Sequence, residues 1–244
     1  MNKRPPRSAA GIAGDFIVVT CEHGGNRIPA EYAGLFRGWR AVLATHRGFD
    51  AGALVMAREF ASALHAPLVA STVSRLLVDL NRSLSNRHAW SDATRALPDP
   101  DHQRIAQRHY APYREQVTAI VTAAVTAGHR VLHISSHSFT PVLDGQVRTA
   151  DVGLLYDPAR RGEAALASRW KAAFAEQAPG LRVRRNYPYA GRNDGLTSFL
   201  RRRFPPAHYV GMEIEVNQAI VLGDAKRWRA LRRAVIATFQ AALQ

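Results

Sequence analysis

Residues 16–25, FIVVTCEHGG, form the stretch that decides the fold. Phe16–Thr20 is a run of aromatic and β-branched residues, which predicts a short buried strand. Glu22 and His23 follow at the end of that run, and two glycines after them permit a tight exit turn. In α/β sheets ligands bind at the carboxyl ends of the strands. The stretch therefore predicts the first strand of an α/β sheet. It also places polar side chains at the end of the strand where such sheets bind ligands.

Further along the chain, short apolar runs that predict strands alternate with segments of helical periodicity. The predicted strands are 67–70, 76–78, 131–135, 152–156, 181–183 and 209–216. The predicted helices are 50–64, 101–128, 164–177 and 225–243. Residues 84–100 and 186–197 have the composition of loops. This alternation predicts an α/β fold in which helices flank a mixed, largely parallel sheet.

Composition predicts a single domain over residues 15–244 after a disordered leader over residues 1–14. The leader lacks the apolar core of a secretory signal, and no apolar run approaches the length of a membrane span. Cys21 is the only cysteine, so an intrachain disulfide is excluded and a reducing compartment is favoured. We expect a cytoplasmic protein without a membrane partner.

The formal charge of +14 is carried almost wholly by arginine. Arginines cluster at 182–185, 201–203 and 227–233, without the interleaved aromatic residues of a stacking platform for single strands. A basic balance of this size suggests nucleic acid, an acidic surface or an anionic substrate as partner, and the pattern of arginines favours a solvated basic face over a nucleic-acid surface. The alternative from another class is a basic, nucleic-acid-associated protein on a degenerate hydrolase scaffold.

Two histidines near predicted strand ends, His23 and His137, are candidate metal ligands. Zinc binds imidazole nitrogens at 2.0–2.1 Å, and a catalytic zinc site keeps one position open. The third ligand stays open between Asn26, Glu22 and Asp50. For Asp50 we favour a different role, the N-cap of the following helix. The alternative for each histidine is a hydrogen-bonded side chain under a loop.

Three further groups of residues suit the hydrolysis of a substrate that carries a carboxylate. Asn81 and Arg82 predict an anion clamp, because the planar guanidinium matches a carboxylate. Arg75 is close in sequence and is a candidate for stabilising oxyanion charge. Glu213 and Glu215 alternate along one predicted strand and share a face, and Glu215, nearer the strand end, is the preferred general base.

Five ordered motifs resemble the N-formylglutamate amidohydrolase family. They are residues 20–29 (TCEHGGNRIP), 46–53 (HRGFDAGA), 74–82 (SRLLVDLNR), 186–197 (NYPYAG at its start and GLT at its end) and 213–218 (EIEVNQ). That family is similar to zinc carboxypeptidases and aspartoacylase-like deacylases. The resemblance implies a zinc-carboxypeptidase-like, phosphorylase/hydrolase-like three-layer sandwich.

By position, the resemblance also implies the members of an active site. It implies metal ligation by His23, Asn26 and His137, with Asn26 where the carboxypeptidases have a glutamate. It implies substrate binding by Asn81, Arg82 and Tyr189, and catalysis by Arg75 and Glu215. The implied cofactor is a divalent metal, zinc first, with cobalt or manganese as alternatives. The implied reaction removes an acyl group from an N-acylated acidic amino acid, as from N-formyl-L-glutamate to formate and L-glutamate.

Asn217 stands where the resemblance leads us to expect an arginine, two residues after Glu215. Cys21 offers an alternative nucleophile beside His23, although a cysteine at a strand end is more often a small buried hydrophobic residue.

Overall fold

The computed structural model describes residues 13–244. The predicted leader lies outside the described residues except for its last two positions, which begin the first strand. The strands of the main sheet are β1 (Ala13–Cys21), β2 (Leu68–Ala70), β3 (His129–Phe139), β6 (Val152–Leu155), β7 (Val183–Arg185) and β8 (Tyr209–Asn217). A separate two-stranded hairpin consists of β4 (Val142–Leu143) and β5 (Gln146–Val147).

The main sheet has the strand order β2-β1-β3-β8-β6-β7. Strands β2, β1, β3 and β8 run parallel to one another, whereas β6 pairs antiparallel with β8 and parallel with β7. The predicted mixed, largely parallel sheet is therefore confirmed. The two central strands are buried almost throughout, as expected for strands covered by helices on both faces.

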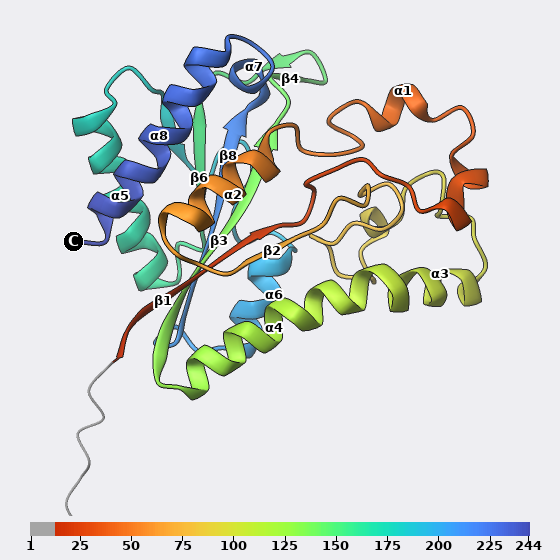
Figure 1. The fold of residues 1–244 in the computed structure, drawn as a ribbon, viewed down its shortest axis with the longest axis horizontal. Coiled ribbons are helices and arrows are strands. Elements are labelled where there is room, and N and C mark those ends of the chain that lie inside the picture. The colour runs from red at the N-terminus through yellow and green to blue at the C-terminus, as the bar shows by residue number, and fades with distance from the viewer. Residues whose placement is uncertain (1–12) are drawn as a thin grey trace, which may run out of the picture.

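Helices cover both faces of this sheet and complete three layers (Figure 1). One face carries α2 (Ala53–Ala63), α5 (Arg161–Gln177) and α8 (Ala225–Ala242), which pack around Phe60, Trp170 and Phe239. The other face carries α4 (Ala111–Thr126) and α6 (Leu196–Arg203). The remaining helices are α1 (Arg40–Leu43), α3 (Asp99–Ile105) and α7 (Gln218–Val221), with 3-10 turns at Ala30–Phe36 and Arg87–Ala89.

Three elements differ from those predicted. Residues 76–78 are not a strand: they form a turn that follows one isolated bridge between Arg27 and Val73. Leu76, Leu77 and Val78 are nevertheless buried, because they pack between the sheet and α4. An apolar run by itself does not distinguish a buried strand from a buried turn, which is why the sequence predicts a strand here. Helix α6 follows a segment predicted as loop, and the predicted helix 101–128 starts at Asp99 and contains a π-helical turn at Ala106–Tyr110.

The topology brings three strand ends to one edge of the sheet. In the register of the ladder, Thr20 of β1 pairs with Ser135 of β3, which pairs with Glu213 of β8. Two residues further along, His137 lies beside Glu215. Strand β3 continues to Phe139, so His137 lies within the strand rather than after its end. Residues that are far apart in the sequence therefore meet where β1, β3 and β8 end.

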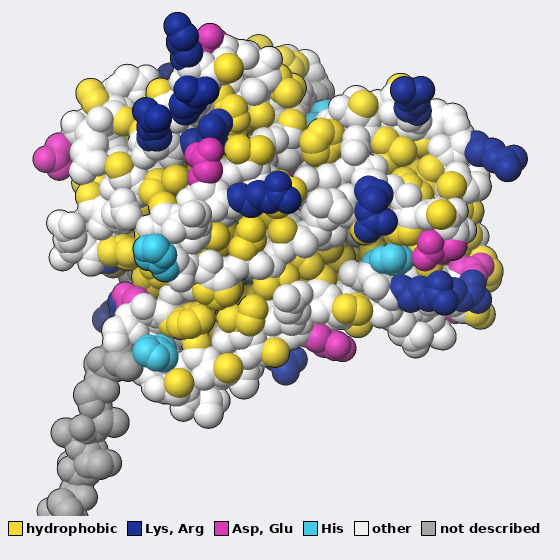
Figure 2. All heavy atoms as spheres, viewed as in Figure 1, with side chains coloured by type: hydrophobic (Ala, Val, Ile, Leu, Met, Phe, Trp, Pro, Cys, Tyr) yellow, Lys and Arg dark blue, Asp and Glu magenta, His cyan; other side chains and the backbone are white. Residues whose placement is uncertain are grey.

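None of the helices formed by residues 13–244 combines the length and the apolar character that crossing a membrane requires. Lys and Arg side chains gather over α8 and around α1 on the face shown in Figure 2. Several arginines of the predicted clusters have structural partners instead: Arg201 forms a buried ion pair with Glu163 (2.9 Å), and both Arg182 and Arg227 pair with Asp151. The basic face is therefore smaller than the composition suggests.

Candidate active site

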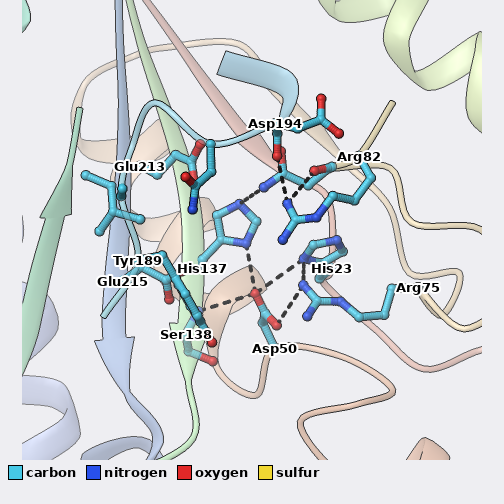
Figure 3. A pocket seen from close by; sticks show the side chains of 14 residues that line it. His23, Asp50, Arg75, Arg82, His137, Ser138, Tyr189, Asp194, Glu213 and Glu215 are labelled. Carbon is cyan, nitrogen blue, oxygen red and sulfur yellow. Dashed lines mark hydrogen bonds and ion pairs between the residues drawn. The ribbon is translucent and has the colours of Figure 1, made fainter. Parts of the chain in front are cut away.

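A pocket at the edge where β1, β3 and β8 end collects seven of the eight residues proposed for the site (Figure 3). Only Asn26 is outside it. The residues that line the pocket are His23, Asp50, Arg75, Asn81, Arg82, His137, Ser138, Leu155, Tyr189, Ala190, Asn193, Asp194, Glu213 and Glu215.

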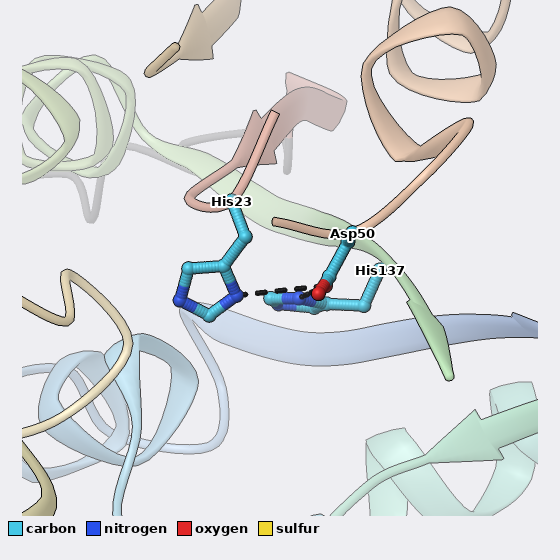
Figure 4. Close-up of side chains that lie close together, drawn as sticks. All are labelled: His23, Asp50 and His137. Atoms are coloured by element: carbon cyan, nitrogen blue, oxygen red, sulfur yellow. Dashed lines mark hydrogen bonds and ion pairs between the residues drawn. The ribbon is translucent and has the colours of Figure 1, made fainter. Parts of the chain in front are cut away.

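Two imidazoles and one carboxylate form a candidate metal centre in this pocket (Figure 4). His23, Asp50 and His137 each offer one ligand atom, and these atoms lie within 4.8 Å of one another. Asp50 Oδ2 is 3.5 Å from His23 Nδ1 and 2.8 Å from His137 Nδ1. Ligand atoms around a tetrahedral ion with bonds of 2.0–2.1 Å are about 3.3 Å apart, so these two distances are close to those of a zinc site. Arg75, whose guanidinium contacts His23 Nδ1, would have to leave that atom when an ion binds.

The third member of this cluster is Asp50 and not Asn26, the residue predicted as the third ligand. Asn26 is exposed, and its Nδ2 donates a hydrogen bond to the carbonyl of Leu43 (3.1 Å). After the glycines the chain does not turn back toward His23, because Arg27 pairs with Val73 and carries the segment away from the pocket. A ligand three residues after His23 therefore does not reach the cluster.

Asp50 takes that place, and its expected role as a helix cap is wrong. The residue before α2 is Gly52, which has a positive φ of 79° that favours glycine. The backbone N–H of Asp50 donates to the carbonyl of His23 (2.9 Å), which fixes the Asp50 backbone beside the end of β1. Its carboxylate accepts from the Ser138 N–H and points into the pocket.

Each histidine of the cluster has a second carboxylate on the far side of its ring. His23 Nε2 is 2.7 Å from Asp79 Oδ1, and His137 Nε2 is 3.0 Å from Glu22 Oε2. Metal-binding histidines usually donate their other N–H to such an outer carboxylate, which orients the ring. Asp79 thus orients His23. Glu22, an alternative third ligand, lies on the opposite side of the His137 ring from Asp50.

The Glu22 carboxylate is ionised although it is fully buried. Burial raises its pKa, but the hydrogen bond and charge of His137 and the hydroxyl of Ser135 outweigh that effect and lower the pKa to about 2. Burial likewise lowers the pKa of His137, and hydrogen bonds to Asp50 and Glu22 more than reverse the change, leaving it well above the usual range. The charged groups of the site are thus strongly coupled to one another.

Glu215 is buried, and one of its carboxylate oxygens lacks a hydrogen-bond partner within the described residues. Its Oε2 has no hydrogen-bond partner among residues 13–244. Burial raises the pKa of Glu215 to about 8, and the carboxylates of Asp50 and Glu213 add to this shift against the opposing charges of His137 and Arg75. Glu213 differs, because its Oε1 accepts a hydrogen bond from Thr197 Oγ1 (2.6 Å). Of the two glutamates, Glu215 is therefore the one that buries a carboxylate oxygen without a hydrogen-bond partner among residues 13–244.

The donor set and the charges of the pocket fit a divalent cation. The pocket is lined by four carboxylates but only two arginines, Arg75 and Arg82. Burial raises the pKa of Asp50 as well, and the charge of Asp79 adds to it, although hydrogen bonds from His137 and Ser138 act against them. Buried carboxylates are retained in proteins when they are paired or bind a metal. A cation between His23, Asp50 and His137 would relieve this crowding of negative charge.

The predicted anion clamp lies across the pocket from Asp50. Arg82 Nη1 donates to the backbone carbonyls of Asn81 (2.8 Å) and Asp194 (2.9 Å). Its Nη2 and Nε have no such partner within the described residues, and so they remain for a ligand. Asn81 Oδ1 accepts from the N–H of Leu196 (2.7 Å) at the start of α6, which leaves the amide nitrogen on the side of His137.

Arg75 reaches the metal cluster directly. Its guanidinium contacts His23 Nδ1 and lies 3.2 Å from Asp50 Oδ1. The loop 186–195 covers the other side of the pocket with Tyr189, whose hydroxyl accepts from Arg148 Nη1 (3.0 Å). Gly153 permits this loop to approach the sheet beside Glu215, because an added Cβ would lie only 1.9 Å from the Tyr187 carbonyl oxygen.

Some residues have roles that the sequence did not suggest. Asp194 lines the pocket and accepts hydrogen bonds from Ser83 and Asn86, and the only signal for it was its place in the polar loop 186–197. Asn217, at the position expected to be an arginine, does not line the pocket. It caps α7 and donates to the carbonyls of Arg148 and Ala150, so its role is structural.

Cys21 does not take part in the site. Its side chain is fully buried in the apolar core between the sheet and α2. Burial raises the pKa of the thiol well above its ordinary value, and the negative charges of Glu22 and Asp50 raise it further. A thiol that stays protonated and inaccessible is not a nucleophile.

Solved structures of other proteins share the fold of this chain. The gene product Atu2144 from Agrobacterium tumefaciens has a similar structure, with a TM-score of 0.81 and 30% identity over 93% of this chain and 90% of that chain. N-formylglutamate amidohydrolase from Ralstonia eutropha JMP134 shares the fold, with a TM-score of 0.67 and 21% identity over 93% and 92% of the two chains. No curated protein sequence matches the chain.

The family of this chain is shown by its sequence: the family model of N-formylglutamate amidohydrolase matches residues 16–222. This match covers most of the chain and includes every residue that lines the pocket. The chain therefore belongs to the N-formylglutamate amidohydrolase family, a family of hydrolases that act on amide bonds.

Proposed function

We propose that the protein is a metal-dependent amidohydrolase that removes the formyl group from an N-formylated acidic amino acid. N-formyl-L-glutamate would give formate and L-glutamate. The observation that carries the proposal is the cluster of His23, Asp50 and His137 in one pocket with the unpaired Glu215. Family membership and the activity of the Ralstonia relative support the choice of substrate.

His23, Asp50 and His137 would hold the ion, with Asp50 in place of Asn26. Two imidazoles and one carboxylate are a ligand set of catalytic zinc, which makes zinc the first choice and cobalt or manganese the alternatives. A divalent ion in a hydrolytic site polarises the carbonyl oxygen of the substrate and lowers the pKa of water.

Glu215 acts as the general base and then as the general acid. It takes a proton from the attacking water while the hydroxyl adds to the formyl carbon, and it returns the proton to the amide nitrogen as the C–N bond breaks. A pKa near neutrality suits both steps, because the group must accept and release a proton at the working pH. The unpaired Oε2 supports this role, since no protein donor competes for the proton.

Two arginines complete the proposed mechanism. Arg82, with the amide of Asn81, binds the α-carboxylate of the substrate through the guanidinium atoms that the backbone leaves free. Arg75, which already contacts the ligand cluster, stabilises the charge that develops on the carbonyl oxygen. Tyr189 closes the pocket over the bound amino acid.

Removal of metal is expected to abolish formate release, and its return is expected to restore it. The purified protein is stripped with a chelator, and release of formate from N-formyl-L-glutamate is measured before and after addition of Zn²⁺, Co²⁺ or Mn²⁺. Circular dichroism of the stripped protein shows whether it remains folded. Turnover that persists in metal-free, folded protein would contradict the metal dependence, and no turnover with any metal would contradict the substrate.

Replacement of Arg82 by alanine is expected to raise KM for N-formyl-L-glutamate by roughly 10- to 100-fold, because a charged hydrogen bond contributes about 1.5–3 kcal/mol. The matched control is Arg192→Ala, which removes an exposed arginine from the loop over the same pocket. Steady-state kinetics of both variants test the assignment. Equal KM values for Arg82→Ala and the wild type would mean that the α-carboxylate binds elsewhere.

A further inference from the structure

The π-helical turn and α4 contact the back of the site through three side chains. Tyr110 donates to the carbonyl of Arg82 (2.8 Å), and Arg114 donates to the carbonyl of Leu80 (3.0 Å). Tyr113 is different, because its hydroxyl donates to Glu22 Oε1 (2.9 Å). Of the three, only Tyr113 reaches a side chain that itself contacts a member of the metal cluster.

A continuous chain of buried hydrogen bonds runs from Tyr113 into that cluster. Glu22 uses Oε1 for Tyr113, while its Oε2 accepts from Ser135 Oγ (2.6 Å) and lies 3.0 Å from His137 Nε2. The opposite ring nitrogen, His137 Nδ1, is 2.8 Å from Asp50 Oδ2. All five side chains are buried, so water does not substitute for any of these contacts.

These hydrogen bonds determine which ring nitrogen of His137 carries the proton and which offers a lone pair to a metal. When Nε2 donates its proton to Glu22, Nδ1 is left as the ligand atom on the side of Asp50. This requires the Glu22 carboxylate to keep its plane and its charge. Tyr113 and Ser135 each bind one oxygen of that carboxylate and so prevent its rotation.

Glu22 depends on these donors more than the equivalent carboxylate behind His23 does. The Asp79 side chain is 12% exposed, against none for Glu22, and its Oδ1 also accepts from the backbone N–H of Asn81 (2.8 Å). Glu22 is fully buried, and Tyr113 is the only donor to its Oε1 within the described residues. Loss of the phenol hydroxyl would leave a buried carboxylate oxygen without a partner, which is unfavourable for the ionised form.

We propose that Glu22 and Tyr113 are positioning residues for the metal, with Glu22 orienting His137 and Tyr113 holding Glu22 in place. This inference rests on the metal site of the proposed function. It assigns a role in metal affinity to a tyrosine that touches neither the pocket nor the substrate.

Tyr113→Phe tests the inference, with Tyr32→Phe as the matched control. Both tyrosines belong to the same apolar cluster and have buried hydroxyls, but the hydroxyl of Tyr32 has no hydrogen-bond partner among residues 13–244. The dissociation constant for Zn²⁺ is measured with metal-free full-length protein in competition with a chelating dye. We expect Tyr113→Phe to weaken zinc binding by about 10- to 100-fold and Tyr32→Phe to leave it unchanged.

The absorption spectrum of the Co²⁺-loaded protein gives a second readout that does not depend on turnover. Tyr113→Phe is expected to shift the visible cobalt bands, because the orientation of a ligand ring changes, and Tyr32→Phe is expected to preserve them. Glu22→Gln keeps the shape of the side chain but removes its charge, and it should weaken zinc binding at least as much. If Tyr113→Phe does not fold, Glu22→Gln still tests whether the carboxylate behind His137 positions the metal ligand.

The outcomes separate the two proposals. If the wild-type protein binds no zinc or cobalt, the metal site of the proposed function is wrong. If the wild type binds zinc but folded Tyr113→Phe and Glu22→Gln bind it equally well, the positioning role is overturned and the proposed function stands. An equal loss of affinity in Tyr32→Phe would also overturn it, because the effect would then reflect packing of the cluster alone.

Discussion

Glu215→Gln is expected to lower kcat for formate release by about 10²- to 10⁴-fold, the usual contribution of a general acid–base group. The amide has nearly the same shape as the carboxylate, but it does not accept a proton from water. Metal content and KM should change little, because Glu215 is not a member of the ligand cluster and lies apart from the anion clamp. Steady-state kinetics with zinc-loaded protein, together with the metal content of each sample, give the test.

Glu213→Gln is the informative comparison, since Glu213 lies on the same face of the same strand. Its Oε1 already accepts from Thr197, so we expect a smaller effect on kcat than that of Glu215→Gln. A large loss in Glu213→Gln combined with normal turnover in Glu215→Gln would transfer the role of base to Glu213. Normal turnover in both variants would remove the proposed proton transfer altogether.

Asp50→Ala is expected to abolish both stoichiometric metal binding and activity. Loss of an outer partner of a ligand usually weakens metal binding about 10- to 100-fold, and loss of the ligand itself should exceed that. Asn26→Ala is the matched variant, because it removes the side chain that the sequence predicted as the third ligand. Among residues 13–244 its amide bonds only to the carbonyl of Leu43, at an exposed position, so metal content and kcat should remain those of the wild type.

Metal content after dialysis, measured together with formate release at saturating zinc, distinguishes these two residues. Thermal unfolding of the metal-free variants provides the control for folding, because Asp50 also accepts from the Ser138 N–H and pairs with Arg75. If Asn26→Ala loses the metal while Asp50→Ala retains it, the third ligand is Asn26 and not Asp50.

Much of the fold was predictable because each central strand contains a short, mainly apolar run. These runs are residues 16–21 of β1, 131–134 of β3 and 209–212 of β8, and β3 and β8 are buried almost throughout because helices cover both faces of the sheet. The amphipathic periodicity of α5 and α8 likewise reflects the single face that each packs on the sheet. Residues 76–78 were assigned wrongly because burial selects the same residues for a turn as for a strand.

The site was predictable to the extent that its residues follow or end these strands. His23, His137 and Glu215 are adjacent in space because β1, β3 and β8 are neighbouring parallel strands, and parallel strands have their carboxyl ends on one side of the sheet. Asn81 and Arg82 reach the same pocket from a buried turn. For these residues the residue types and their order along the chain were sufficient to predict that they lie in one pocket.

The third member of the metal cluster and the outer carboxylates were decided only by the tertiary structure. Asp50 joins the cluster because its backbone bonds to the carbonyl of His23, and Asn26 is excluded because the chain leaves the site after the glycines. Glu22 follows Cys21 directly in sequence, yet its role depends on Tyr113 and His137, which are far away along the chain. Spacing describes which side chains are near in sequence, whereas a ligand set depends on where the backbone turns and which side chains then meet.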